Sequence, residues 1–453
     1  MRKLRIGSGA GYGGDRIEPA IEIMKKGNLD YIIFECLAER TIALAQKQKL
    51  KERDKGYNEL FEYRMKKILP ICIEKKVKVV TNMGAANPLA AAKVTKQMAE
   101  SMGIRKLKIA AVLGDDVFSN IEKYLDLEIM ETGEKLETIK HLIISANAYI
   151  GTKGIVEALE NGADIVITGR VADPSLVLAP LIYEFGWKYD DYKMLGKGTL
   201  AGHLLECAGQ VTGGYYADPG YKDVPDLWNI GFPIGEIYEN GDIIITKLED
   251  AGGIVTVDTC KEQILYEIQD PQRYYTPDVI ADFSKVTVEQ VENNKVLVKG
   301  ASGIKKTELL KTSIGYKDCY IGEGEISYGG SGALERAKLA GDIIKKRLEY
   351  IELPIEELRI DYIGVNSLYK DKLSNTIKKG RNDFNEVRLR VAARTLNKEH
   401  AEIIGNEVEA LYTNGPAGGG GARKYVREIV SIASVMIPER DVDIKVVYEE
   451  ICV

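Results

Sequence analysis

The first half of the chain alternates short apolar, β-branched runs with stretches of helical periodicity, and no other feature constrains the fold as strongly. Each run ends in glycine or polar residues. Strands that are apolar on both faces are typical of a parallel sheet covered by helices on both sides. We therefore predict an α/β fold in which residues 1–230 form a parallel, doubly wound N-terminal domain. The runs cover residues 4–6, 31–34, 77–81, 108–113, 142–146 and 164–168.

The second half has a different pattern and predicts an α+β domain over residues 231–453. Two alternating runs flank Asn240-Gly241, which is typical of a type I′ hairpin. A similar pair of runs flanks Asn293-Asn294. After them we expect a helix over 333–351, strands over 358–365 and 386–394, a helix, a strand over 407–413, a glycine loop, a helix over 422–436 and a strand over 442–450.

Charge and cysteine spacing narrow the classes of protein. The chain has 62 Lys and Arg against 68 Asp and Glu, a net charge of −6, which argues against nucleic-acid binding. Its six cysteines include no C-x-x-C pair and it has only three histidines, so iron–sulfur and His/Cys zinc sites lack their spacing. The cofactor is left unknown, and magnesium stays open because carboxylate sites need no fixed spacing. We found no signal peptide or membrane span, so we expect a cytoplasmic protein that binds no membrane.

Polar residues follow the apolar runs at the points where the strands should end. Ligands of parallel sheets bind beyond these carboxyl ends, so we expect the residues to converge. We assign Glu35 and Asp173 to proton transfer. Arg170 can bind a substrate carboxylate through two parallel hydrogen bonds. An ion pair with Asp173 that only stabilises the fold is the alternative. The residues assigned to substrate binding here are Ser8, Asn82, Asn147, Tyr149 and Arg170.

His203 and Glu206 form a second catalytic candidate. They are three residues apart in AGHLLECAGQVTGG, so on a helix they share one face. Such a pair can transfer protons or contribute to a metal site, and the alternative is a satisfied surface pair. The neighbouring Cys207 is better explained as a packed thiol than as a nucleophile.

Two glycine-rich stretches raise the question of anion binding. Residues 7–14 contain G-x-G-x-x-G, and Glu35 follows 21 residues after Gly14, as in a dinucleotide fingerprint. Asp15 and Glu18 would repel a pyrophosphate there, so a tight turn is the alternative. Residues 414–421 precede a predicted helix, and we assign Gly418, Gly419 and Arg423 to an anion site. A simple connector is the alternative.

The chain resembles the acyclic terpene utilisation AtuA family. The resemblance extends from residue 4 to about residue 424, and the long GADIVITGRVADPSLVLAP block is its most specific part. It implies a cytoplasmic bacterial protein of a catabolic pathway with CoA thioester intermediates, and a small companion subunit. Other stretches that carry it are LRIGSGAGYGGDR, FECLAERTIALA, TNMGAANP, AGHLLECAGQVTGG, IGFPIGEI, KLEDAGGIVTVDT and YTNGPAGGGGARK.

We expect an enzyme, a lyase of the hydratase or dehydratase type that acts on a branched carboxylate or its CoA thioester. The ligand would be a small anion, and we expect a homo-oligomer. One alternative is a nucleotide- or CoA-dependent enzyme that uses residues 7–14. The other is a non-catalytic subunit of a catabolic complex with a small partner protein.

Overall fold

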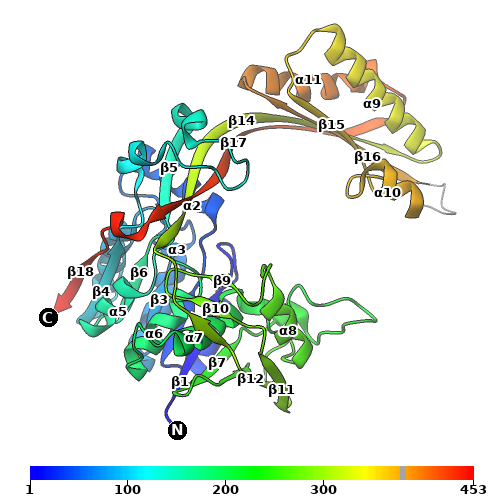
Figure 1. Cartoon of the computed structure of the whole chain (residues 1–453). Coiled ribbons are helices and arrows are strands. Elements are labelled where there is room, and N and C mark those ends of the chain that lie inside the picture. The colour runs from blue at the N-terminus through cyan, green and yellow to red at the C-terminus, as the bar shows by residue number, and fades with distance from the viewer. Residues whose placement is uncertain (378–383, 453) are drawn as a thin grey trace. The chain divides into compact units, whose positions relative to one another are not determined.

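The structure is a computed structural model and describes residues 1–377 and 384–452. The chain divides into two compact units: residues 1–315 with 432–453, and residues 316–431. This division does not follow the boundary expected at residue 230, because strands beyond 230 join the main sheet of the first unit. The fold is mixed α/β with several sheets, as the sequence predicts (Figure 1).

A ten-stranded sheet organises the first unit, in the order β11-β12-β8-β7-β1-β2-β3-β6-β4-β18. Its five central strands are parallel, and the strands on both flanks join through antiparallel pairs. The central strands are β1 (Lys3–Ala10), β2 (Tyr31–Phe34), β3 (Lys78–Thr81), β6 (Ile165–Thr168) and β4 (Lys106–Leu113). The flanking strands are β7 (Ile234–Tyr238), β8 (Ile243–Thr246), β11 (Thr287–Glu292), β12 (Lys295–Lys299) and β18 (Lys445–Cys452).

Helices cover both faces of this sheet. The apolar residues of α1, α3 and α4 share one core with one face of the strands, and those of α5, α6 and α7 share a second core with the other. This is why the central strands are apolar on both sides. The helices of the first unit are α1 (Glu18–Lys26), α2 (Glu39–Lys51), α3 (Phe61–Lys75), α4 (Pro88–Ser101), α5 (Lys153–Glu160), α6 (Ser175–Phe185), α7 (Tyr192–Glu206) and α8 (Val257–Leu265).

One expected strand lies outside this sheet. β5 (Ile143–Ala148) pairs with β14 (Leu309–Gly329), so the prediction that residues 142–146 join the parallel sheet was wrong. The connection from β4 to β5 holds two 3₁₀ helices, Phe118–Tyr124 and Leu136–Leu142, and no α-helix. A strand usually joins a parallel sheet through a crossover helix that packs on the sheet. The connection before β5 lacks such a helix, which agrees with its pairing elsewhere.

Half of the first glycine stretch, residues 7–10, is strand. β1 continues to Ala10, so Gly7 and Gly9 lie inside it, and α1 does not begin until Glu18. A dinucleotide loop needs these glycines between the strand and a helix start. The expected loop over 7–14 is therefore shortened to 11–14, which weakens the nucleotide-dependent alternative.

The Asn240-Gly241 hairpin forms between β7 and β8, but its turn differs from the expected type I′. Gly241 has a φ of +81°, whereas Asn240 is not among the residues with positive φ. The amide of Tyr238 donates to the carbonyl oxygen of Asp242, which leaves a three-residue loop. A glycine in the left-handed region at the end of such a loop gives the common bulged hairpin.

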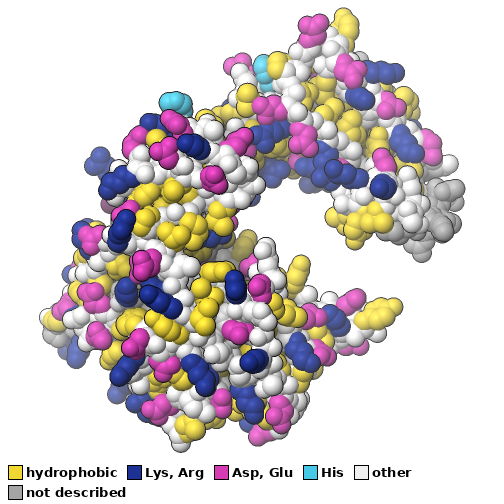
Figure 2. Space-filling view, in the orientation of Figure 1, with side chains coloured by type: hydrophobic (Ala, Val, Ile, Leu, Met, Phe, Trp, Pro, Cys, Tyr) yellow, Lys and Arg dark blue, Asp and Glu magenta, His cyan; other side chains and the backbone are white. Residues whose placement is uncertain are grey.

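The second unit is built on a sheet in the order β15-β16-β14-β17, and β14 and β17 continue into it from the first unit. One face of β16 packs Leu389 and Val391 into a core with α9 and α11. The other face carries arginines such as Arg390, and Figure 2 shows Lys and Arg gathered over these strands. Its remaining elements are β15 (Glu357–Ile363), β16 (Glu386–Thr395), β17 (Gly419–Pro438), α9 (Ala333–Tyr350), α10 (Lys370–Ile377) and α11 (Lys398–Asn414). A small separate sheet of the first unit holds β9 (Tyr274–Tyr275), β10 (Ile280–Asp282) and β13 (Ser302–Ile304).

Two assignments near the C-terminus were wrong. Residues 407–413 belong to helix α11, whose buried residues Ile404, Val408 and Leu411 recur at helical spacing. Residues 422–436 form part of strand β17 rather than a helix. This segment is rich in β-branched residues, and pairing along β14 satisfies its backbone, so sheet formation outweighs its weak helical period.

Candidate functional site

A cavity of about 1120 Å³ opens in the first unit at the ends of parallel strands. Gly11 follows β1, Glu35 follows β2 and Arg170 follows β6, and all three line it. We call it the acidic cavity, because its lining has six carboxylic acids against three cations. The acids are Asp15, Glu35, Glu39, Asp173, Glu206 and Glu267, and the cations are Arg16, Arg170 and Lys311. The rest of the wall is largely apolar or aromatic.

His203 and Glu206, at the end of α7, form a buried pair in this wall. Nδ1 of His203 lies 2.7 Å from Oε1 of Glu206, and Nε2 lies 3.2 Å from the carbonyl oxygen of Ile264. A carbonyl oxygen can only accept, so Nε2 carries a proton. Both ring nitrogens are therefore occupied, and the ring has no nitrogen left for a ligand. His203 is better described as positioning Glu206 than as a proton carrier to substrate.

Glu206 keeps one oxygen free. Its Oε2 is buried without a hydrogen-bond partner among the described residues, while Oε1 faces His203. Burial raises the pKa of Glu206 to about 7, against the opposing charge of His203. Burial alone would lower the pKa of His203, but the charge and hydrogen bond of Glu206 outweigh it and raise that pKa. A carboxyl group that titrates near neutrality suits proton transfer.

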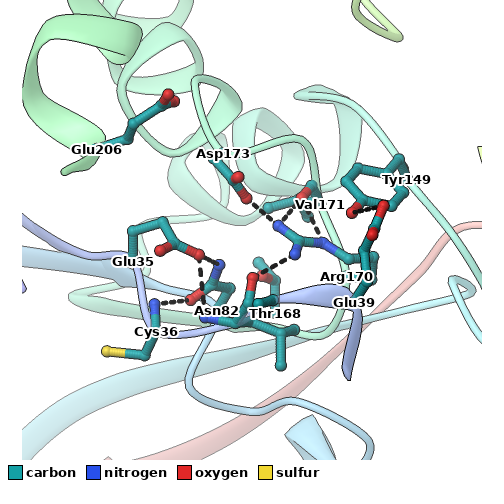
Figure 3. A network of polar contacts seen from close by, with 12 residues as sticks. Glu35, Cys36, Glu39, Asn82, Tyr149, Thr168, Arg170, Val171, Asp173 and Glu206 are labelled. Carbon is teal, nitrogen blue, oxygen red and sulfur yellow. Dashed lines mark hydrogen bonds and ion pairs between the residues drawn. The ribbon is translucent and has the colours of Figure 1, made fainter. Parts of the chain in front are cut away.

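Glu35 is held by an amide network directly after β2 (Figure 3). Its Oε1 accepts from Nδ2 of Asn82 at 2.9 Å and from the amide of Leu37 at 3.0 Å. Asn82 is itself fixed, because its Oδ1 accepts from the amide of Cys36 at 2.8 Å. Burial raises the pKa of Glu35 to about 8, and the negative charge of Asp173 adds to the rise. Glu35 is thus a carboxylic acid that stays protonated at neutral pH.

Arg170 is buried and its guanidinium is occupied by the protein (Figure 3). It donates to the carbonyl oxygens of Val171 and Leu37 and forms an ion pair with Asp173. Its Cζ lies 4.5 Å from the centre of the Tyr149 ring. These contacts favour the structural alternative for Arg170, since few N–H groups remain for a substrate carboxylate.

Asp173 and Tyr149 line the cavity, and both contact Arg170. Burial raises the pKa of Asp173, while the neighbouring guanidinium opposes the rise. The hydroxyl of Tyr149 donates to Glu39 at 3.2 Å, and Lys311 lies 2.6 Å from the same Glu39 oxygen. Tyr149 therefore presents a neutral phenol beside a paired Lys–Glu group.

The other predicted binding residues do not line the acidic cavity. The side-chain amide of Asn82 donates to Glu35 at 2.9 Å, and that of Asn147 donates to Asp115 at 2.9 Å. Ser8 is fully buried in β1, and its hydroxyl has no partner among the described residues. The glycine-loop residues belong to the second unit, where they lead into strand β17 instead of the predicted helix. They are Gly418, Gly419 and Arg423.

Among the wall residues that the sequence did not indicate are Glu39, Lys311 and Tyr274. Glu39 and Lys311 form an ion pair, and Tyr274 packs against the His203 ring with centroids 5.5 Å apart. Glu39 lies four residues after Glu35, which directly follows strand β2. Its closeness to a strand end was the one indication of Glu39 in the sequence. Lys311 and Tyr274 come from the second half of the sequence, and no motif marks them.

Residues 1–377 and 384–452 are the part of the chain that the structure describes. In that part of the chain, no group of three or more His, Cys, Asp or Glu is placed to hold a metal ion. Over the same ranges, no helix combines the length and the apolar character that crossing a bilayer requires.

Comparison with known proteins agrees with the resemblance in the sequence. The family model described as acyclic terpene utilisation family protein AtuA matches residues 4–448. The chain belongs to the AtuA family. Membership implies a role in acyclic terpene utilisation. No curated protein and no solved structure matches the chain.

Proposed function

We propose that the protein is a lyase of the hydratase type, which adds water to a branched, unsaturated CoA thioester or removes water from the corresponding alcohol. The observation that carries this proposal is a pair of buried carboxyl groups, Glu35 and Glu206, in the wall of the acidic cavity. Burial raises the pKa of both, to about 8 for Glu35 and about 7 for Glu206, and one Glu206 oxygen has no hydrogen-bond partner among the described residues. Carboxyl groups that titrate near neutrality can act as acid or as base.

In this scheme Glu206 is the base and Glu35 the acid. Ionised Glu206 takes a proton from water, the hydroxyl oxygen bonds to the β-carbon of the conjugated double bond, and Glu35 gives its proton to the α-carbon. Asn82 holds Glu35 in place, and His203 holds Glu206. In the reverse direction the two carboxyl groups exchange roles, so water leaves.

The walls favour the thioester over the free acid. Six carboxylic acids line the cavity and the buried cation Arg170 is engaged by the protein, so a free carboxylate would meet net negative charge. A thioester carbonyl is neutral and avoids this cost. The apolar wall, which includes Phe232, Ile268 and Leu310, offers contact to a branched hydrocarbon.

The test is water addition to a panel of branched enoyl-CoA thioesters, followed by mass spectrometry in ¹⁸O-labelled water. We expect activity in the wild type, and a loss of kcat of about 100-fold or more in Glu206→Gln and in Glu35→Gln. Glu160→Gln is the control, because Glu160 is exposed at the end of α5 and lies outside the cavity. Activity in neither wild type nor variants, or equal activity in all four proteins, would refute the proposal.

A further inference from the structure

A second cavity of about 730 Å³ lies in the first unit and shares part of its wall with the acidic cavity. Pro277, Leu309 and Leu310 line both. We call the second one the basic cavity. Its charged lining consists of Lys153, Lys305, Lys306, Arg440, Asp278, Glu308 and Glu439. Cations thus outnumber carboxylates here, whereas carboxylates outnumber cations two to one in the acidic cavity.

Two of the three carboxylates in the basic cavity are already engaged. Asp278 accepts from the hydroxyl and the amide of Thr152, at 2.8 and 3.0 Å, and from the hydroxyl of Ser175 at 2.8 Å. It is 6% exposed, so it is part of the supporting wall. Glu439 bridges two lysines.

Glu439 lies between Lys153 and Lys306. Its two oxygens are 2.9 Å from Nζ of Lys153 and 2.5 Å from Nζ of Lys306. The bridge holds both ammonium groups at this edge of the cavity, and the trio keeps one net positive charge. Within the described part of the chain, Lys305 and Arg440 form no ion pair and are exposed. They are free to meet a ligand.

We propose that the basic cavity binds the phosphate groups of the carrier of the substrate, a CoA thioester. This rests on the proposed function, and deepens it by assigning the carrier's phosphate groups to named residues. Lysine and arginine are the side chains that bind phosphate, and arginine does so with two parallel hydrogen bonds. Pro277, Leu309 and Leu310 line both cavities, so the two are adjacent, and in this proposal one ligand extends over these residues from Lys305 and Arg440 to Glu206.

The test compares binding of CoA by calorimetry in the wild type and in a double variant, Lys305→Glu with Arg440→Glu. Both positions are exposed, so the fold should survive. We expect the dissociation constant for CoA to rise by about tenfold or more, because attraction becomes repulsion. The matched control is Lys123→Glu with Lys299→Glu, two exposed lysines outside both cavities, for which we expect no change. Circular dichroism confirms folding.

Further ligands identify the source of the phosphate. Pantetheine lacks the phosphates of CoA, and we expect the double variant to bind it as the wild type does. Inorganic phosphate and pyrophosphate, titrated alone, test for a site that takes any small phosphate. Binding of these salts without binding of CoA would overturn the proposal, as would equal CoA affinity in wild type and double variant or no CoA binding at all.

The outcome also separates this inference from the proposed function. CoA binding that depends on Lys305 and Arg440, with no water addition to any thioester, would uphold the basic cavity and refute the hydratase. The opposite result is water addition to pantetheine and CoA thioesters with equal KM, and with the same KM in the double variant. It would uphold the hydratase and refute phosphate binding in the basic cavity.

Discussion

Nδ1 of His203 lies 2.7 Å from Oε1 of Glu206, while Nε2 of the same ring faces the carbonyl oxygen of Ile264. The carbonyl fixes one proton on Nε2, so the His–Glu bond contains a single further proton shared by the two residues. The other Glu206 oxygen is buried and has no hydrogen-bond partner among the described residues. The pair thus acts as one titrating unit in the wall of the acidic cavity.

Replacing His203 by Gln should raise the pKa of Glu206 above about 7. Burial pushes this pKa up and the imidazole opposes it, so only the upward effect remains in the variant. NMR titration of ¹³C-labelled glutamate carboxyl groups measures the change, and the acidic limb of the kcat/KM profile should move to higher pH. His141→Gln is the control, since His141 is exposed. An unchanged titration would show that the imidazole does not tune Glu206.

Glu35→Gln should stabilise the protein at pH 8 and have little effect near pH 4.5. The folded state holds the Glu35 proton up to about pH 8, whereas an unfolded glutamate loses it near pH 4.3. Between these values the folded state binds more protons, so stability falls as pH rises. A neutral amide removes this loss of folding stability, which is on the order of 5 kcal/mol. Melting temperatures at both pH values measure it, and an equal shift at the two would contradict the raised pKa.

Arg170→Met should cost about 3 kcal/mol of stability. The variant leaves Asp173 without its cation, and the carbonyl oxygens of Leu37 and Val171 without their donors. Denaturant unfolding measures this loss. Arg53→Met is the control, because Arg53 is exposed, and we expect its effect to stay within about 0.5 kcal/mol. Equal stability of the two variants would mean that Arg170 is free for a ligand.

Gly11→Ala should destabilise the first unit, whereas Gly420→Ala should not change stability. A Cβ on Gly11 would lie 2.3 Å from the carbonyl carbon of Cys207, a backbone atom that cannot move aside. Nothing lies within 4 Å of a Cβ on Gly420, and its φ is not positive. Thermal unfolding of both variants measures the difference. A neutral Gly11→Ala would show that β1 and the end of α7 are not packed this closely.

Local pattern was enough for much of the fold. The apolar runs that became β1, β2, β3, β4 and β6 are continuous and β-branched, so the strands and their parallel pairing could be predicted. The helix at 333–351 and the final strand were also predicted. Local pattern failed for residues 407–413 and 422–436, where helix and strand preferences are close. For residues 422–436 a distant partner, strand β14, decided the outcome.

The sequence by itself determined that Glu35, Arg170 and Asp173 would follow parallel strands, and that His203 and Glu206 would share a helix face. Those positions depend on periodicity within short segments. Only the tertiary structure decided what each side chain can do. It bound the Arg170 guanidinium to carbonyl groups and Asp173, and left one Glu206 oxygen free. It also brought Lys311 to the acidic cavity, and Lys305 and Arg440 to the basic one, from far along the chain. Charge, burial and hydrogen bonding are set by neighbours in space, and these neighbours are separated by up to hundreds of residues in sequence.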